Sequence, residues 1–159
     1  GSAMEGAQAI YNNDTADLAD YGRLYNWYAV DDSRGLCPSG WHVPADGEFM
    51  TLEMELGMSE SEANSPGWRG TDQGTQMKTD YGWIAGGSGT NLSGFSSLPG
   101  AGRYSTGSYG DAETNGYLWS SSPSGSAAWS RGLAYSKEDV SRDDALSPQH
   151  GFSVRCVRD

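Results

Sequence analysis

Few side chains in this sequence could carry out chemistry. His42 and His150 are the only histidines. His42 stands between Trp41 and Val43 in a stiff segment flanked by prolines, which favours a packed, hydrogen-bonded side chain over a catalytic base. His150 lies in a turn, and nothing in the sequence pairs it with a serine or cysteine nucleophile. We therefore expect no catalytic triad and no catalytic residues.

Two groups of aspartates raise the possibility of a bound calcium ion: Asp139, Asp143 and Asp144, and Asp31 and Asp32. Neither group has ligands at alternate positions followed by a closing glutamate, so each favours a solvated acidic loop. Two separated histidines do not suggest a zinc site. The glycine-rich stretch 86–89 lacks the lysine and the helix start of a phosphate-binding loop. We expect neither a metal nor any other cofactor.

Length and charge exclude several classes of protein. The chain has 159 residues, enough for one domain with a proper core. Its formal net charge is -11, with ten Lys and Arg against 21 Asp and Glu, which argues against binding to a phosphate backbone. No apolar run has transmembrane length and there is no signal peptide, although residues 1–4 look like an expression scar.

The order of the expected elements indicates an α+β fold. Residues 5–20 show no clear period and predict an irregular lead-in, and 21–30 fit either a helix or a strand. A helix should begin with Asp46 as its cap and end at Gly57, and a short, weak helix could follow over 59–65. The strands come late in the chain, so we expect a small antiparallel sheet with much irregular structure.

The stretch 129–136 alternates between large and small side chains. The large residues are Trp129, Arg131, Leu133 and Tyr135, and the small ones between them are Ser130, Gly132, Ala134 and Ser136. Because successive side chains of a strand point to opposite faces, this pattern predicts one anchoring face and one nearly bare face. A bare, polar face would suit ligand display. The alternative is a solvated edge strand that has no partner.

Several motifs, taken in order, resemble the Fibrobacter succinogenes major paralogous domain. They are Tyr21 to Trp27, Cys37 to Pro44, Gly94 to Gly100, Trp119 to Ser121 and Gly151 to Asp159. The resemblance covers nearly the whole chain from Tyr21 onward. It implies a C-type lectin-like domain over 21–159, with two helices packed on a small, twisted antiparallel sheet and long irregular loops.

The resemblance also carries expectations about location and structure. Members of the family are typically surface or secreted domains of bacteria, and some relatives are variable proteins of diversity-generating retroelements, which occur in cells and in phages. Two features depart from the family: Ala45 stands where members usually have serine, and the usual upstream strand is mostly missing. In an exported family, Cys37 and Cys156 suggest one disulfide bond. Two buried free thiols are the alternative.

These patterns predict a binding module that is not an enzyme. Its ligand, a protein or a glycan at a surface, would contact the bare face and the neighbouring loops: Ser124, Ser126, Ser130, Gly132, Ala134, Ser136, Lys137, Asp139, Ser141, Asp143 and Asp144. The scaffold would be held by Arg131, Leu133, Tyr135, Val140 and Arg142. The alternative function is a glycan-adhesion or structural domain of a bacterial surface lipoprotein, in which exposed Trp and Tyr stack on sugars. A degenerate enzyme of the formylglycine-generating type is a third, weaker hypothesis.

Overall fold

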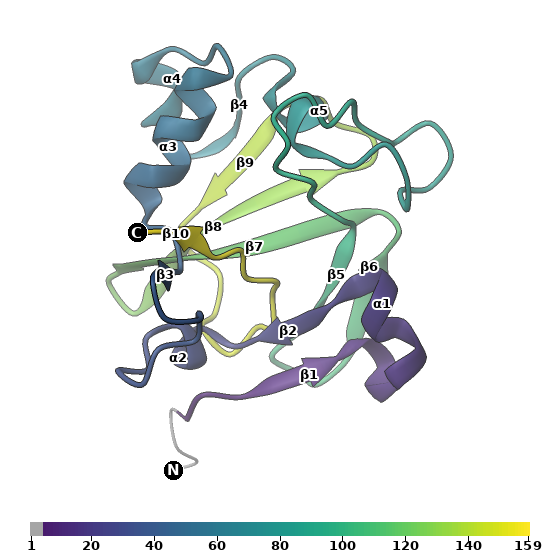
Figure 1. Cartoon of the computed structure of the whole chain (residues 1–159), viewed down its shortest axis with the longest axis vertical. Helices are drawn as coiled ribbons and strands as arrows, with labels where there is room; N and C mark the ends of the chain where they lie inside the picture. The colour runs from purple at the N-terminus through teal and green to yellow at the C-terminus, as the bar shows by residue number, and fades with distance from the viewer. Residues whose placement is uncertain (1–4) are drawn as a thin grey trace.

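A six-stranded sheet organises the protein, which a computed structural model describes over residues 5–159 (Figure 1). The strands lie in the order β4-β9-β8-β7-β5-β6. Their bounds are β4 Gly67–Arg69, β5 Gly100–Arg103, β6 Tyr109–Ala112, β7 Asn115–Ser124, β8 Ala127–Ala134 and β9 Val140–Asp143. All neighbours are antiparallel except β5 and β7, which meet in parallel at Ala101 and Gly116. The α+β class is confirmed, but the sheet is larger than expected.

The N-terminal part of the chain is more ordered than its sequence pattern indicated. Strand β1 (Gln8–Ile10) pairs with β2 (Arg23–Tyr25) in a separate two-stranded sheet, so the expectation of an irregular lead-in over 5–20 was wrong. Two short 3-10 turns and helix α1 (Leu18–Tyr21) connect the two strands. The pattern gave no signal because a three-residue strand is too short to show a period. Residues 1–4, the expected expression scar, lie outside the described residues.

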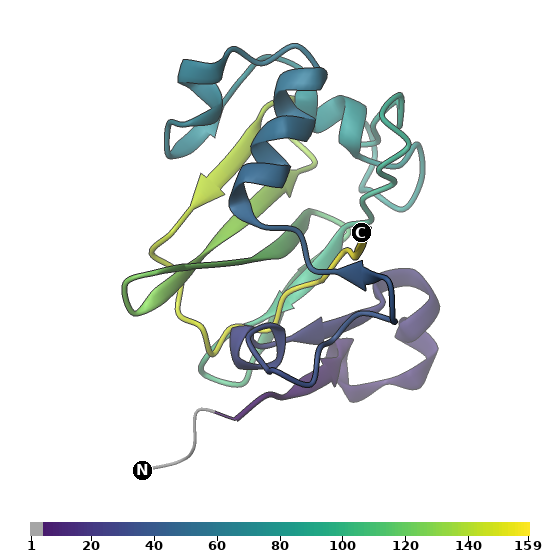
Figure 2. The same cartoon turned by 60° about the vertical axis from the view of Figure 1, so that its left-hand side comes forward.

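The main helix is α3 (Asp46–Glu55), which lies over one face of the sheet (Figure 2). Its cap differs from the prediction. Ala45 is the cap residue, and its backbone N–H donates to Glu48 Oε2 at 2.8 Å, while Asp46 lies in the first turn and accepts from arginines of the sheet. Glu48 therefore performs the capping that Asp46 was expected to perform.

The other helices are single turns, so the prediction of two helices on the sheet was too simple. They are α2 (Trp27–Val30), α4 (Glu60–Ala63) and α5 (Gln73–Met77). The expected weak helix is α4, which Ser59 caps by accepting from the N–H of Glu62. No helix within residues 5–159 has the length and hydrophobicity to cross a membrane.

Two hydrophobic clusters pack around the sheet. The first joins Trp119 of β7 and Ala128 of β8 to residues outside the sheet: Trp27, Val30, Val43 and Phe152. The second joins Leu133 of β8 and Val140 of β9 to Met77 and Trp83. Ala128 and Leu133 are an odd number of positions apart on β8, so each face of this strand contributes to one of the two clusters.

The sequence predicted that the small face of β8 is nearly bare, but the structure shows that this face is buried. Only 2% of the surface of Ser130 is exposed, and Gly132 and Ala134 are also buried. β8 is an inner strand, flanked along this stretch by β7 and β9, so neighbouring side chains surround its small residues. Tyr135, expected as an anchor, is 43% exposed because β8 ends at Ala134. Arg131, Leu133, Val140 and Arg142 are buried as predicted.

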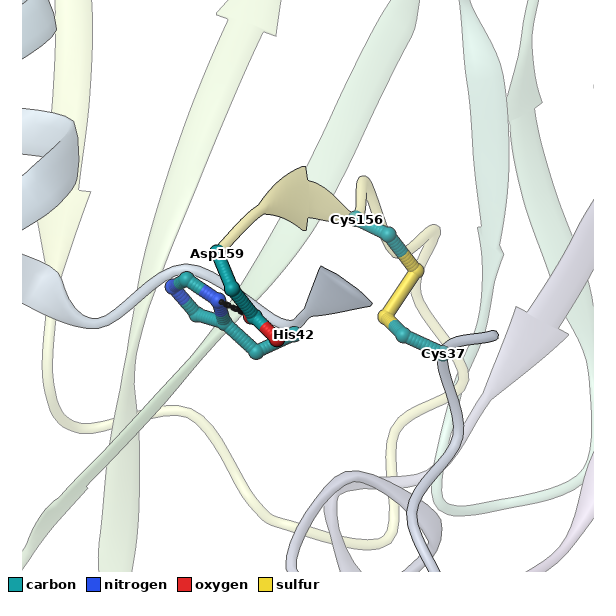
Figure 3. The surroundings of a disulfide bond; sticks show 4 residues. All are labelled: Cys37, His42, Cys156 and Asp159. Carbon is teal, nitrogen blue, oxygen red and sulfur yellow. Dashed lines mark hydrogen bonds and ion pairs between the residues drawn. A yellow bond between two sulfur atoms is a disulfide. The ribbon is translucent and has the colours of Figure 1, made fainter. Parts of the chain in front are cut away.

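A disulfide bond joins Cys37 to Cys156, which confirms the expected pair (Figure 3). It ties the segment before β3 (Trp41–His42) to the segment before β10 (Val157–Arg158), and these two strands pair with each other. The last strand is shorter than expected. Upstream of it, Phe152 and Ser153 form only isolated bridges, to Tyr25 and Leu118.

Candidate functional site

The face of the sheet that points away from α3 contains a hollow of about 240 Å³, called here the sheet hollow. Four neighbouring strands and one loop line it, with Trp68 from β4, Asn115 and Tyr117 from β7, Ser130, Gly132 and Leu133 from β8, Ser141 and Asp143 from β9, and Leu146 from the loop after β9. Strand pairing aligns these positions, because Tyr117 and Ser141 both lie opposite Gly132, and Trp68 lies opposite Ser141. Gly132, at the centre, has no side chain that would fill the hollow.

Polar groups and aromatic rings share the wall of the sheet hollow. Ser130 Oγ donates to the carbonyl of Asp143 at 3.2 Å, and Asp143 Oδ1 accepts from the N–H of Ala145 at 2.8 Å. Trp68 is 43% exposed. The site has a rigid floor and a half-exposed rim, which suits recognition of a ligand by shape and hydrogen bonding.

Tyr117 is held at the rim by a small hydrogen-bond network. Its hydroxyl donates to Asp111 Oδ2 at 2.9 Å and accepts from Asn115 Nδ2 at 3.1 Å. Tyr104 donates to the same carboxylate oxygen. Burial and the hydrogen bond to Asp111 raise the pKa of Tyr104 to about 12 and also raise the pKa of Tyr117. Both hydroxyls therefore keep their protons at neutral pH, and the Tyr117 ring has a fixed orientation.

On the face of the sheet that α3 covers, a buried ion-pair network holds this helix to the strands. Arg131 donates to Asp46 and to Glu53, both at 2.7 Å. Arg142 donates to Asp46 at 2.7 Å, and Arg69 donates to Glu53 at 2.5 Å. Burial raises the pKa of Asp46, but the hydrogen bonds from Arg142 and Arg131 outweigh burial, so that pKa lies below its ordinary value. The network makes the opposite face of the same strands rigid.

Four of the predicted ligand residues meet in the sheet hollow: Ser130, Gly132, Ser141 and Asp143. Ala134 lies beside it, paired with Asn115. The others lie apart. Ser124 donates to Asp144 Oδ2 at 3.0 Å near the turn between β7 and β8, where Ser126 is exposed, and Ser136, Lys137 and Asp139 belong to the loop after β8. Lys137 alone of that loop reaches the rim, since its Nζ lies 5.5 Å from the centroid of the Trp68 ring.

Sequence reasoning missed Trp68, Asn115, Tyr117 and Leu146 as residues of the hollow. Trp68 precedes the other strands of the site by about fifty residues and sits in a segment that looked like a loop. Asn115 and Tyr117 carried a usable signal, because they alternate along β7 as Ser130 and Gly132 do along β8. Nothing in the sequence indicated Leu146.

Neither histidine lies in the sheet hollow. His42 Nδ1 lies 2.7 Å from Asp159 Oδ1 (Figure 3). Its Nε2 lies 2.8 Å from Glu48 Oε1, so two carboxylates hold the ring between β10 and α3. His150 packs against Tyr104 and Phe152. Among residues 5–159, no group of three or more His, Cys, Asp or Glu side chains could hold a metal ion.

The two histidines should titrate on opposite sides of their ordinary pKa. Hydrogen bonds to Asp159 and Glu48 raise the pKa of His42 above 6.5, whereas burial lowers the pKa of His150 below it. The His42 contacts therefore contribute stability that is complete below pH 6.5 and is lost as the pH rises through the raised pKa. An NMR titration of the ring protons measures both values.

Two variants provide controls for the titration. Asp159→Asn and Glu48→Gln should each bring the pKa of His42 back toward 6.5 and leave His150 unchanged. If the pKa of His42 in the unaltered protein were equal to or lower than that of His150, the hydrogen bonds of His42 with Asp159 and Glu48 would not form in solution.

Comparison with known proteins places the chain in a family context. One family model, described as the Fibrobacter succinogenes major domain, matches residues 2–158. The matched range includes every strand of the main sheet, the lining of the sheet hollow and both cysteines. No curated protein and no solved structure matches the chain.

Proposed function

The chain belongs to the Fibrobacter succinogenes major domain family, and on this premise we propose that it is a ligand-binding module, not an enzyme, whose site is the sheet hollow. One observation carries the proposal: residues from four neighbouring strands line a hollow of about 240 Å³. Binding sites are usually concave, with apolar or aromatic walls and a few placed polar groups.

The arrangement separates the site from the parts that stabilise the fold. The residues of the ion-pair network and those of the sheet hollow alternate along the same strands, as Arg131 does with Ser130 and Gly132. Rim side chains can therefore change while α3 stays attached to the sheet. This supports the finer proposal of a variable surface on a C-type lectin-like scaffold, as in the variable proteins of diversity-generating retroelements.

The disulfide bond supports a location outside the cytoplasm. Such bonds persist in secreted and surface proteins, where no reducing system removes them. We propose a place at a bacterial surface or on a phage particle, with a protein or a glycan as the ligand.

Selection from two libraries tests the proposed function. The first varies the rim of the sheet hollow at Trp68, Asn115, Ser141, Asp143 and Leu146. The second varies exposed positions of α3 and α4 at Thr51, Glu55, Glu60 and Ser61. The rim library should yield binders to unrelated targets, and its members should keep their melting temperature within about 5 °C, because exposed or half-exposed changes cost little stability. Equal numbers of binders from both libraries would contradict a dedicated surface.

Glycan adhesion remains the second candidate function, because several aromatic rings are exposed. Trp41 is 46% exposed, Trp68 43%, Tyr81 63% and Tyr135 43%. Such rings can stack on sugars. If this candidate is right, Trp41→Ala and Tyr81→Ala, which lie outside the sheet hollow, should weaken binding to a polysaccharide as much as Trp68→Ala does.

A further inference from the structure

We propose that the sheet hollow accepts one cationic side chain, a lysine or an arginine, from a partner protein with a basic surface. The inference rests on the proposed function, since it takes the sheet hollow as the binding site, and it names the chemistry of the ligand. Its basis is the set of unused acceptors in the hollow, the aromatic wall and the distribution of charge over the molecule.

The one charged residue that lines the hollow within residues 5–159, Asp143, is an acceptor. No donor from these residues reaches Asp143 Oδ2, Asn115 Oδ1 or Ser141 Oγ, while the Ser141 hydroxyl, the second N–H of Asn115 and the Trp68 indole N–H are unused donors. The Tyr117 and Ser130 hydroxyls already donate within the protein. A ligand that pairs with the Asp143 carboxylate must bring donors. Ammonium and guanidinium groups bring three and five donors and no acceptor, and Asp143 supplies the opposite charge.

The aromatic wall of the hollow also suits a cation. Trp68 already attracts one, because Nζ of Lys137 lies 5.5 Å from its ring centroid. A cation over an aromatic face is attracted by the negative charge of the ring face, most strongly for tryptophan. Lys137 is exposed and belongs to a loop, so it can move aside when a ligand cation enters. Lys137 should therefore oppose binding while Asp143 favours it.

The fold makes the surface more acidic than the composition suggests. Of the ten Lys and Arg, four are buried: Arg69, Lys78, Arg131 and Arg142. Of the 21 Asp and Glu, only Asp46 and Glu53 are buried. The remaining surface has 19 acidic residues and six basic ones. A field of this sign attracts basic partners and repels acidic ones.

The volume limits what can enter. At about 240 Å³ the hollow is smaller than the pockets of about 300–1,000 Å³ that hold drug-sized ligands, so it suits one long side chain better than a peptide segment. The partner must therefore present its basic side chain from a surface that rests on the rim.

Two peptides that differ in one side-chain head group, charged in one and neutral in the other, test the proposal. The probes are acetyl-Gly-Arg-Gly-amide and the same peptide with citrulline, the neutral isostere of arginine, and methyl glucoside serves as a sugar probe. NMR titration should show shifts at the amides of Ser130, Gly132 and Ser141 and at the Trp68 indole with the arginine peptide. The citrulline peptide should bind at least about tenfold more weakly, because it has lost the charge-assisted hydrogen bonds.

Three variants locate the effect. Asp143→Asn keeps Oδ1 for the N–H of Ala145 but removes the charge, and it should weaken the arginine peptide about tenfold. Asp144→Asn makes the same charge change one residue along, outside the hollow, and should change the affinity less than twofold. Lys137→Gln should strengthen binding. Weaker binding in Asp143→Asn, stronger binding in Lys137→Gln and an affinity changed less than twofold in Asp144→Asn would together indicate a cation in the sheet hollow.

Several results would overturn the inference. Equal binding of the arginine and citrulline peptides would exclude recognition of charge, and equal losses in Asp143→Asn and Asp144→Asn would show general attraction to an acidic surface. Shifts in the hollow with methyl glucoside alone would assign a sugar ligand. In each case, binders from the rim library would still support the proposed function, which fails only if that library performs no better than its control.

Discussion

Replacing Glu53 with alanine should lower the free energy of unfolding by about 3–5 kcal/mol, the largest loss we expect from a single substitution. Glu53 has no exposed surface, and its two carboxylate oxygens accept from Arg131 at 2.7 Å and from Arg69 at 2.5 Å. Without it, both guanidinium groups stay buried with less opposing charge. The cost comes mainly from these buried cations, since Arg69 would lose its carboxylate partner and Arg131 would keep only Asp46.

Urea unfolding measures this effect, and two variants interpret it. Glu55→Ala lies on the same helix but is exposed, so it should change the free energy of unfolding by less than about 0.5 kcal/mol. Glu53→Gln keeps the shape and one acceptor, so it should cost less than Glu53→Ala and separate the loss of charge from the cavity. If Glu53→Ala and Glu55→Ala were equally stable, the network would not hold α3 to the sheet.

Removing the disulfide bond should cost about 2–5 kcal/mol. Cys37 and Cys156 are 119 residues apart in sequence, so their bond restricts most of the unfolded chain. Cys37 also packs against the first hydrophobic cluster. Restricting the unfolded chain lowers its entropy and so favours the folded state, most strongly for long loops.

Thermal melts of the oxidised protein and of Cys37→Ala with Cys156→Ala measure this contribution. A reducing agent should lower the melting temperature of the first protein and leave that of the double variant unchanged. Alkylation without reduction, followed by intact mass measurement, should find no free thiol in protein made under oxidising conditions. Two modified cysteines in that sample would show that the bond does not form.

Local patterns in the sequence were sufficient for several elements. The helix predicted from Asp46 to Gly57 matches α3 to within two residues at its end. The alternation over 129–136 predicted a strand, and Arg131 and Leu133 are buried as that pattern required. The disulfide pair followed from the family resemblance and is confirmed. These features depend on neighbours in sequence or on motifs that the family shares.

The alternation of large and small residues in β8 was enough to predict which of them share a face, whereas the groups that pack on each face depend on the tertiary fold. A period of two shows to which face each side chain points but not which strands lie beside it. Ser130 and Gly132 therefore looked exposed, although β7 and β9 flank them. The partners of Arg131 and the Trp68 wall of the sheet hollow come from distant segments. Burial and site geometry arise from long-range packing, which no local pattern contains.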